Sequence, residues 1–313
     1  MSKISYLITG GAGNVGSALA RRLAGDVENL VVIADNLATG EMSKIPEGDN
    51  VVFIKSDVND YNDIAPIFGR YNFDYVFHYA AVVGVQRTLE NPMMVLEDIE
   101  GIKNILRLSK GIGVKRVFYS SSSEVYGEPF EIPQNEHTTP LNSRLPYAIV
   151  KNVGEAFFKS FQQEYGLEYT IFRFFNTYGP NQSEDFVIPK FLKLALRNEP
   201  LQVYGDGQQT RSFCFVDDNV DTCIKALQSK LHANEVLNVG SDIEMTVLDL
   251  AQYIIELTGS TSEIIHLPAL EEGDMTRRCP DTTKMKKLLD RELISLEAGL
   301  QKLMNHYENR KES

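Results

Sequence analysis

The stretch ISYLITGGAGNVG, residues 4–16, decides the fold. An apolar run typical of a strand leads directly into Gly10, Gly13 and Gly16, and residues 14–25 continue with apolar residues at helical spacing. The first glycine permits a tight turn, the second lets a pyrophosphate approach the backbone, and the third allows the helix to pack closely on the strand. The N-terminus of that helix would face the phosphates. These residues predict a strand–turn–helix unit that binds a dinucleotide.

An acidic residue ends the next strand and selects among dinucleotides. The apolar run of residues 30–35, LVVIAD, ends in Asp35, about 20 residues after the turn. A carboxylate there can bind a ribose 2′-OH and repels a 2′-phosphate, so we expect NAD rather than NADP as the cofactor. Beside the three glycines and Asp35, the expected cofactor-binding residues are Asn14, Val15, Asn36, Asp57, Val58, Ala80, Tyr147 and Lys151.

Asp57 has two interpretations. It follows the third apolar run, residues 51–56, where an acid often contacts the adenine. It could equally be the N-cap of the helix expected from residue 61 onward. The sequence leaves both open.

Apolar runs and helical patterns alternate from residue 4 to residue 174. Further strands are expected at residues 75–80, 116–121 and 169–174, with helices at 61–71, 92–113 and 146–166. Such alternation predicts an α/β fold, with helices on both faces of a Rossmann-type, doubly wound parallel sheet. After Asn176 the elements become shorter and less regular. We therefore expect a Rossmann domain at residues 1–176 and a smaller α/β lobe at 177–313, with some strand or helix exchange back to the first.

The composition narrows the range of partners. The net charge of −12 disfavours nucleic acid and anionic membranes, so a phosphate-bearing ligand must be held by a few placed cations. Three scattered cysteines, no signal peptide and no long apolar window predict a cytoplasmic protein without a disulfide framework. No cluster of His, Cys and acidic residues has metal-ligand spacing, so no metal is expected.

Tyr147 and Lys151 are the strongest candidates for chemistry. They lie four residues apart in a helical pattern and so share one face. A phenol is too weak a base at neutral pH, but a nearby ammonium stabilises the phenolate. Ser122 ends the apolar run of residues 116–121, and strand C-termini line the active crevice of this fold.

Several motifs resemble the extended short-chain dehydrogenase/reductase superfamily, and within it the nucleotide-sugar epimerases, decarboxylases and dehydratases. Besides Gly10–Gly16 and the Tyr147/Lys151 pair, they are HYAAV (78–82), SSSSEVYG (120–127), FRFFNTYGP (172–180), VYGDGQQTRSFCFVDD (203–218), NVGS (238–241) and TRRCPDTTK (276–284). The resemblance covers nearly the whole chain. It implies a nucleotide-diphosphate sugar as the substrate and the smaller lobe as its binding site.

The resemblance also implies a role for each matching residue. Tyr147 would be the general base, Ser122 would bond the reacting oxygen, and Lys151 would bind the nicotinamide ribose and tune Tyr147. Asn176 would lie against the substrate diphosphate, and Arg211 with Arg277 or Arg278 would clamp the diphosphate and the nucleotide. Structural alternatives exist, in which Ser122 caps a loop, Tyr147 is a core residue, and Arg211 pairs with Asp217 or Asp218. His78 is expected to be structural.

The reaction depends on Ser123 and Glu124. The shared first step in the superfamily is oxidation at a ring carbon, usually C4. Dehydratases carry an Asp–Glu pair where this chain has Ser123–Glu124, so dehydration is disfavoured. Decarboxylases carry Ser–Glu, but usually also an Arg after the catalytic Lys, where this chain has Asn152.

Epimerases most often have a small or apolar residue at position 124, and Glu124 could be a structural carboxylate bonded to a neighbouring loop. Asp98 is a further departure, because the family commonly has Asn there. We place a 4-epimerase first, a C4 dehydrogenase acting on a hexose or heptose second and a uronate decarboxylase third. An NAD(H)-binding regulator without activity is disfavoured, because Tyr147 and Lys151 are both present.

The two helices expected at residues 92–111 and 146–165 carry more apolar residues than a sheet-facing helix needs. Their family counterparts pair across a two-fold axis. A homodimer is therefore expected.

Overall fold

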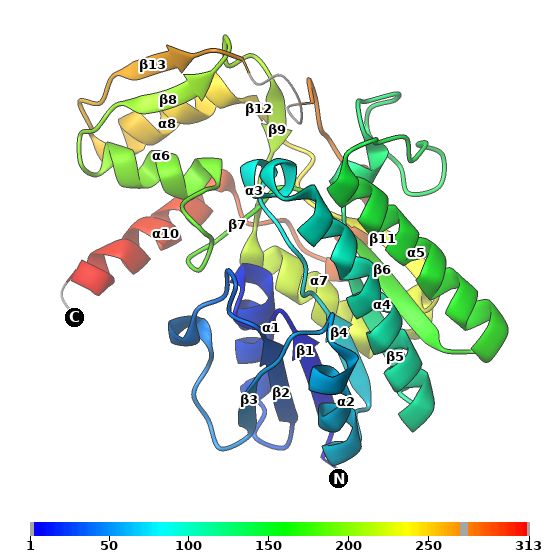
Figure 1. Cartoon of the computed structure of the whole chain (residues 1–313). Helices are drawn as coiled ribbons and strands as arrows, with labels where there is room; N and C mark the ends of the chain where they lie inside the picture. Colours follow the sequence, from blue (N-terminus) through cyan, green and yellow to red (C-terminus); the bar gives the residue numbers. More distant parts are fainter. Residues whose placement is uncertain (1–2, 270–274, 312–313) are drawn as a thin grey trace.

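The computed structural model describes residues 3–269 and 275–311, and a seven-stranded parallel sheet forms its centre (Figure 1). The strand order is β11-β6-β5-β4-β1-β2-β3, and each neighbouring pair is parallel. The strands are β1 (Ser5–Thr9), β2 (Leu30–Asp35), β3 (Val51–Lys55), β4 (Tyr75–His78), β5 (Arg116–Ser122), β6 (Glu168–Phe174) and β11 (Glu235–Val239). The predicted doubly wound sheet and its six expected strands are confirmed.

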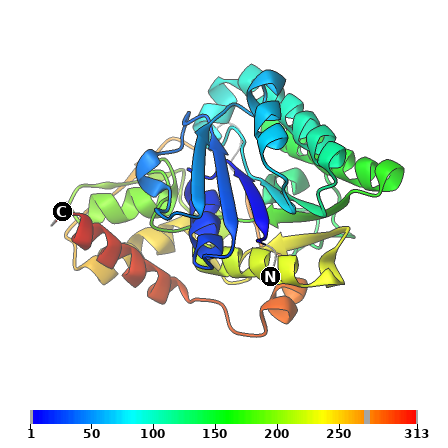
Figure 2. The same ribbon diagram turned by 90° about the horizontal axis from the view of Figure 1, so that it is seen from below.

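Helices cover both faces of this sheet because alternate strand residues point to opposite sides. On β1, Leu7 packs in the cluster that holds Ile105 of α4, whereas Ile8 packs in the cluster that holds Leu19 of α1. Figure 2 shows the cyan and green helices on one side of the blue strands and the yellow helix on the other. The first layer is α2 (Tyr61–Arg70), α4 (Pro92–Ile112) and α5 (Pro146–Tyr165); the second is α1 (Asn14–Ala24) and α7 (Val216–Gln228).

Glycines end the long helices as the sequence predicts. Gly113 follows α4 with φ +76° and Gly166 follows α5 with φ +71°, both in the left-handed region that glycine adopts without strain. The short helix α3 (Val85–Glu90) was not predicted, because six residues are too few to show a helical period.

The strand order reverses between β1 and β4. From β1 the chain runs outward through β2 and β3, and then returns to add β4 on the other side of β1. Ligands of such sheets bind at this switch point, beyond the C-terminal ends of the strands. Gly10 lies there with φ +70°, and a Cβ on it would come within 2.6 Å of the backbone N of Ala80 after β4. The turn after β1 therefore packs directly on the segment after β4.

The C-terminal part of the chain forms a smaller group of elements at the upper left of Figure 1 and also returns to the main sheet. Both β11 and α7 belong to the layers of the main sheet. The division of the chain at Asn176 and the exchange between its two parts remain predictions. The remaining strands are β7 (Thr177–Tyr178), β8 (Leu201–Tyr204), β9 (Thr210–Ser212), β10 (Cys214–Phe215), β12 (Glu244–Thr246) and β13 (Ile264–Leu267). The remaining helices are α6 (Val187–Ala195), α8 (Val247–Thr258), α9 (Thr283–Leu289), α10 (Leu296–Lys311), η1 (Met42–Lys44), η2 (Ser123–Tyr126) and η3 (Lys230–His232).

Cys214, Cys223 and Cys279 are all buried and unpaired. Within residues 3–269 and 275–311, no helix is long and apolar enough to cross a membrane.

Candidate active site

Of the five predicted catalytic residues, three meet at the C-terminal end of β5, and the other two, Ser123 and Glu124, begin η2 directly after it. Ser122 is the last residue of β5, and Tyr147 and Lys151 lie one turn apart at the start of α5, which packs on β5. Gly154, one turn further along α5, makes this packing possible, because a Cβ there would overlap the Tyr119 ring of β5. The ammonium of Lys151 lies 5.7 Å from the centre of the Tyr147 ring, and Tyr147 shares a hydrogen bond with Ser122.

Ser122 has two partners. Its Oγ also accepts a hydrogen bond from the Glu124 backbone N–H at 3.2 Å and thereby caps η2. Ser122 therefore caps η2, as the structural alternative predicted, and it also contacts Tyr147. The cap fixes the Ser122 hydroxyl beside Tyr147.

Burial weakens Lys151 as a cation. Its side chain is 3% exposed, and burial lowers its pKa to about 8, although the negative charge of Asp98 raises it. Its Nζ donates a hydrogen bond to the Ser120 carbonyl at 2.6 Å. This hydrogen bond holds the Lys151 ammonium at the C-terminal end of β5, near the Tyr147 ring.

The environment of Tyr147 keeps its hydroxyl protonated when no ligand is bound. Burial raises the pKa of Tyr147 well above its ordinary value, and the negative charges of Glu124 and Asp98 raise it further. The Ser122 hydrogen bond and the positive charge of Arg278 oppose them. To act as a base, Tyr147 needs further positive charge nearby, such as that of an oxidised nicotinamide.

Glu124 and Arg278 form a buried ion pair beside these residues. Arg278 Nη1 lies 2.8 Å from Glu124 Oε1, with side-chain exposures of 7% and 14%. The structural interpretation of Glu124, as a carboxylate bonded to a neighbouring loop, fits this contact. However, its Oε2 is buried and has no hydrogen-bond partner among the residues that the structure describes. A charged pair next to Tyr147 can also bind a charged group of a substrate.

The turn between β1 and α1 fits a dinucleotide. No side chain caps the N-terminus of α1, and a Cβ on Gly13 would meet nothing nearer than the Gly10 carbonyl at 3.3 Å. The backbone at the start of α1 is therefore open to a pyrophosphate. At the end of β2 the Asp35 carboxylate accepts hydrogen bonds from the N–H groups of Ala12 at 3.0 Å and Leu37 at 2.8 Å. This fixes the carboxylate beside the glycine turn, where a ribose would lie.

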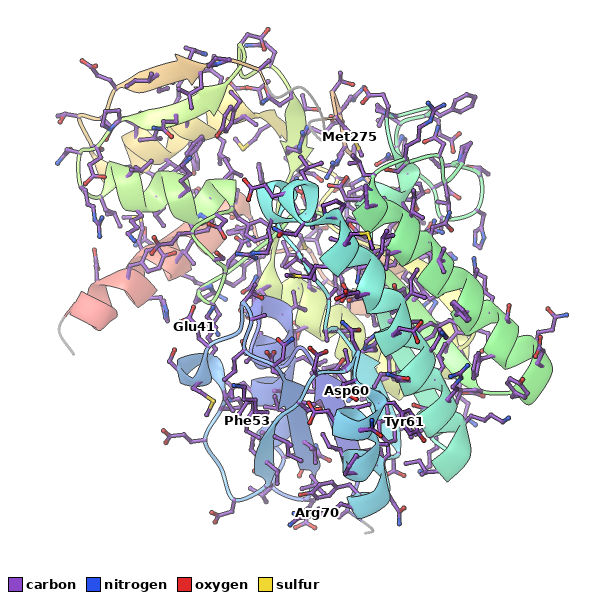
Figure 3. All side chains as sticks on the ribbon, in the orientation of Figure 1. Glu41, Phe53, Asp60, Tyr61, Arg70 and Met275 are labelled. Carbon is purple, nitrogen blue, oxygen red and sulfur yellow. The ribbon has the colours of Figure 1, made fainter. Side chains whose placement is uncertain are left out.

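Asp57 does not cap α2, so that interpretation is wrong. Asp60 is the N-cap and accepts a hydrogen bond from the Asn62 N–H at 2.8 Å; Figure 3 labels it at the start of the helix, next to Tyr61. Asp60 is closer to the helix start and can reach its free N–H groups. Asp57 instead accepts a hydrogen bond from Asn36 Nδ2 at 3.2 Å. Asn36 and Asp57, both predicted to bind the cofactor, therefore lie together. Val58, the next residue in the chain, is buried.

The predicted phosphate-binding residues have different environments. Arg277 is bidentate to Glu244, with both N–O distances 2.7 Å, and its side chain is half exposed. Arg211 is buried in β9 and donates to the Thr210 carbonyl at 2.7 Å. Asn176 follows β6 and is partly buried. Between Arg277 and Arg278, it is Arg278 that lies next to the catalytic residues.

The alternative in which Arg211 pairs with Asp217 or Asp218 is not supported, because both acids pair with other cations. Asp217 pairs with Lys302 at 3.0 Å and Asp218 with Arg291 at 2.6 Å. His78 is structural, as predicted: its Nδ1 lies 2.9 Å from Thr9 Oγ1, and burial lowers its pKa to about 3.

A buried polar network behind the site escaped the sequence interpretation. Arg173 of β6 is bidentate to Glu155 of α5 at 2.8 and 2.7 Å, and Ser121 donates to the same carboxylate at 2.7 Å. Arg173 also donates to the Tyr126 hydroxyl at 2.9 Å. The network joins α5, β5, β6 and η2, and thereby fixes Ser122 relative to Tyr147. The sequence signal for this network was Arg173, an arginine inside the apolar run of residues 169–174.

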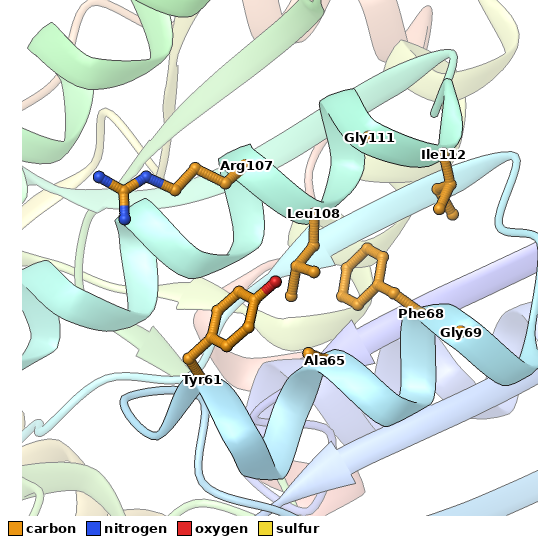
Figure 4. Close-up of a pocket in the computed structure, with 8 residues that line it drawn as sticks. All are labelled: Tyr61, Ala65, Phe68, Gly69, Arg107, Leu108, Gly111 and Ile112. Atoms are coloured by element: carbon orange, nitrogen blue, oxygen red, sulfur yellow. The ribbon is translucent and has the colours of Figure 1, made fainter.

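A groove of about 650 Å³ lies elsewhere, between α2 and α4 (Figure 4). Tyr61 and Phe68 line it from α2, and Arg107 and Leu108 from α4. It lies on the outer surface of the helical layer and contains none of the predicted site residues.

The fold and the site together define a class of protein. A doubly wound parallel sheet with an open glycine turn at its switch point, and with Ser, Tyr and Lys at the end of β5, is the arrangement of a dehydrogenase/reductase that uses a nicotinamide dinucleotide. Residues 6–240 match the model of the NAD dependent epimerase/dehydratase family. The chain belongs to this family, which agrees with the expected cofactor, NAD.

Relatives within the family carry out different reactions. The chain is 36% identical to a UDP-N-acetyl-alpha-D-glucosaminuronate decarboxylase of Bacillus cytotoxicus, over 96% of this chain and 97% of that protein. A UDP-glucose 4-epimerase structure from Thermotoga maritima, with UDP-glucose, covers 98% of this chain and all of its own at a TM-score of 0.92 and 32% identity. A Thermus thermophilus UDP-glucose 4-epimerase in complex with NAD covers 97% of this chain and 99% of its own, with a TM-score of 0.90 and 28% identity.

Proposed function

We propose that this chain oxidises C4 of a nucleotide-diphosphate uronate and then releases the sugar carboxylate as CO₂. The observation that carries the proposal is the buried Glu124–Arg278 pair beside Tyr147. A buried guanidinium next to the reacting centre suits a substrate with a carboxylate at C5. A neutral hexose offers it no charge.

This proposal changes the order that the sequence suggested. The 4-epimerase came first there because Asn152 replaces the arginine that decarboxylases usually carry after the lysine. Arg278 supplies a cation from another part of the chain, next to the serine and tyrosine. The identity to a uronate decarboxylase supports the same choice.

The residues would divide the work as follows. Tyr147 takes the proton of the C4 hydroxyl while Ser122 bonds the same oxygen. The glycine turn and Asp35 would hold NAD, which when bound would supply the acceptor for the C4 hydride and the hydride for the final reduction. The C4 ketone makes the carboxylate that of a β-keto acid, so the bond to the carboxylate breaks, and its electron pair moves toward the C4 oxygen. Tyr147 and Ser122 stabilise that oxygen by hydrogen bonds, CO₂ leaves, and C5 takes up a proton.

A 4-epimerase is the second candidate. The Thermotoga maritima epimerase, which matches nearly the whole chain, favours it. In that case Glu124 and Arg278 would be a structural pair, and the 4-keto sugar would turn in the site before it is reduced.

The experiment is to incubate the protein with UDP-glucuronate, UDP-N-acetylglucosaminuronate, UDP-glucose and UDP-N-acetylglucosamine in separate reactions, and to follow product mass and NADH absorbance. Our proposal predicts loss of CO₂ from a uronate with no lasting NADH. Conversion of a neutral sugar at unchanged mass would instead support the epimerase. A product that has lost two hydrogens, with NADH persisting on the protein, would support a C4 dehydrogenase.

We propose a cytoplasmic location for this chain, as the sequence predicts. Its three unpaired cysteines are consistent with a reducing compartment. The net charge of −12 supports the expectation that neither nucleic acid nor an anionic membrane is a partner.

A further inference from the structure

Asp98 is a buried carboxylate close to the site that the steps above do not use. It lies on α4 and is 8% exposed. Both of its oxygens face donors: Oδ2 accepts a hydrogen bond from the Val82 N–H at 2.7 Å, and Oδ1 accepts one from Asn59 Nδ2 at 3.3 Å. Val82 belongs to the segment after β4 that packs on the glycine turn.

The surrounding donors require a hydrogen-bond acceptor at both side-chain oxygen positions of residue 98. Asn59 Oδ1 already accepts a hydrogen bond from the Gly101 N–H at 3.0 Å, so its NH₂ group must point toward residue 98. An asparagine at position 98 would direct its own NH₂ group at a donor, either the Val82 N–H or the Asn59 amide. Only an ionised carboxylate accepts from both. Asp98, where the family commonly has Asn, thus matches the two donors that face it, the Val82 N–H and the Asn59 amide.

The same carboxylate acts on Lys151. Its field raises the pKa of Lys151, against burial, which lowers that pKa to about 8. Burial also raises the pKa of Asp98 itself, which the Val82 hydrogen bond, the charge of Lys151 and the Asn59 hydrogen bond oppose. The charge of Asp57 raises the pKa of Asp98 as well.

Glu155, one turn from Lys151 on α5, is paired with Arg173 at 2.7 Å. Three further titratable groups near Lys151 are neutral. Burial lowers the pKa of His78 to about 3 and raises that of Tyr119 well above its ordinary value. Tyr147 is likewise protonated before a cofactor binds. The negative charge that balances the ammonium therefore comes from α4, through Asp98.

We propose that Asp98 is a positioning residue: its carboxylate holds the segment around Val82 and supplies the counter-charge that keeps Lys151 protonated for binding the nicotinamide ribose. The inference rests on the role proposed for Lys151, and it does not depend on which reaction follows C4 oxidation.

The test measures the affinity for NAD as a function of pH by calorimetry, without any sugar, on protein freed of nucleotide. Since the ammonium form of Lys151 binds the ribose, affinity falls as pH rises through its pKa, and we expect an inflection near pH 8. Lys151→Met should remove this inflection. Asp98→Asn should move it about one pH unit or more downward, because the balancing charge is lost. An inflection that persists in Lys151→Met, or stays in place in Asp98→Asn, would overturn the proposal.

A double variant separates charge from hydrogen bonding. In Asn59→Asp/Asp98→Asn, the new carboxylate at position 59 accepts from the Gly101 N–H and from the amide introduced at position 98, while the oxygen of that amide accepts from Val82. All hydrogen bonds are restored, but the negative charge has left position 98. We expect the melting temperature lost in Asp98→Asn to recover, while the inflection stays displaced. Recovery of both would contradict the counter-charge role, since hydrogen bonding alone would then explain the effect.

Discussion

Tyr147 illustrates how a residue's surroundings limit its chemistry. Burial and the charges of Glu124 and Asp98 raise its pKa, so the phenol holds its proton until positive charge approaches. The positive charge of Arg278 opposes these effects but does not outweigh burial. In our proposal, the base therefore forms only when the cofactor is in place.

The first prediction follows from this role. Tyr147→Phe removes the hydroxyl and keeps the ring, so turnover should fall roughly 10²- to 10⁴-fold, while NAD affinity changes little. Steady-state rates and calorimetric titration check the two parts. A variant with half the original activity would exclude Tyr147 as the base.

Glu124 separates the candidate reactions. In a decarboxylase, Glu124→Gln weakens the hold on Arg278, so CO₂ release should slow more than C4 oxidation, and NADH should accumulate on the protein. Glu164→Gln, a change on the exposed face of α5, serves as the control. If Glu124→Gln changes the rate on a neutral sugar without any accumulation of NADH, the epimerase interpretation holds instead.

At the scale of elements, the turn between β1 and α1 offers a matched pair of variants. Gly10 has φ +70° and contacts Ala80, so Gly10→Ala should lower the melting temperature through strain and overlap. Gly13 has an extended backbone, and a Cβ on it would lie 3.3 Å from the Gly10 carbonyl, a tight contact that a small shift relieves. Gly13→Ala should therefore destabilise the fold much less than Gly10→Ala. Its methyl group would instead occupy the path of the pyrophosphate and lower NAD affinity. Equal loss of affinity and stability in both variants would contradict the assignment.

Which segments form strands and helices was easier to predict than which of these elements lie side by side. Continuous apolar runs and helical spacing predicted six strands and the long helices, because a two-sided sheet imposes these patterns locally. The sequence predicted that some strand or helix would return to the first domain, but it did not identify β11 as that strand, since a five-residue strand carries no record of its partner. The same limit applied to the site. Motifs placed Ser122, Tyr147 and Lys151 together, but pairing of Glu124 with Arg278 rather than Arg277 depends on how distant loops pack.

At the scale of the whole molecule, the Glu155–Arg173 pair ties α5 to the sheet. Burial alone would raise the pKa of Glu155, but the hydrogen bonds and charge of Arg173 outweigh burial and lower it. A lowered folded-state pKa means that the pair stabilises the protein above the unfolded-state value near 4.5 and that this stability is lost as pH falls through the folded-state pKa.

Glu155→Gln should therefore destabilise the protein at neutral pH by about 3–5 kcal/mol, the usual result of leaving a buried charge unpaired. The difference from the unaltered protein should shrink in acid, below pH 4.5. Urea unfolding at several pH values measures it. A difference that is constant with pH would mean that the carboxylate is not ionised in the folded protein.

The exposed apolar side chains support the expected homodimer. Met93, Met94 and Leu96 of α4 are 70%, 47% and 38% exposed, and Ile149 of α5 is 41% exposed. We predict a dimer in which α4 and α5 pair with their copies across a two-fold axis. Light scattering should give twice the chain mass, and Met93→Glu/Met94→Glu should give monomers. A monomeric mass for the unaltered protein at micromolar concentration would exclude this assembly.

The central claim is that the site removes hydride from C4 of a nucleotide sugar. Its most direct test is a rapid-mixing experiment with the NAD-loaded protein and a uronate nucleotide that carries deuterium at C4, followed by NADH absorbance and by the position of the label in the product. We predict transient NADH that forms more slowly than with the unlabelled sugar, and product that carries the deuterium at C4. Turnover without NADH and without an isotope effect would contradict the account.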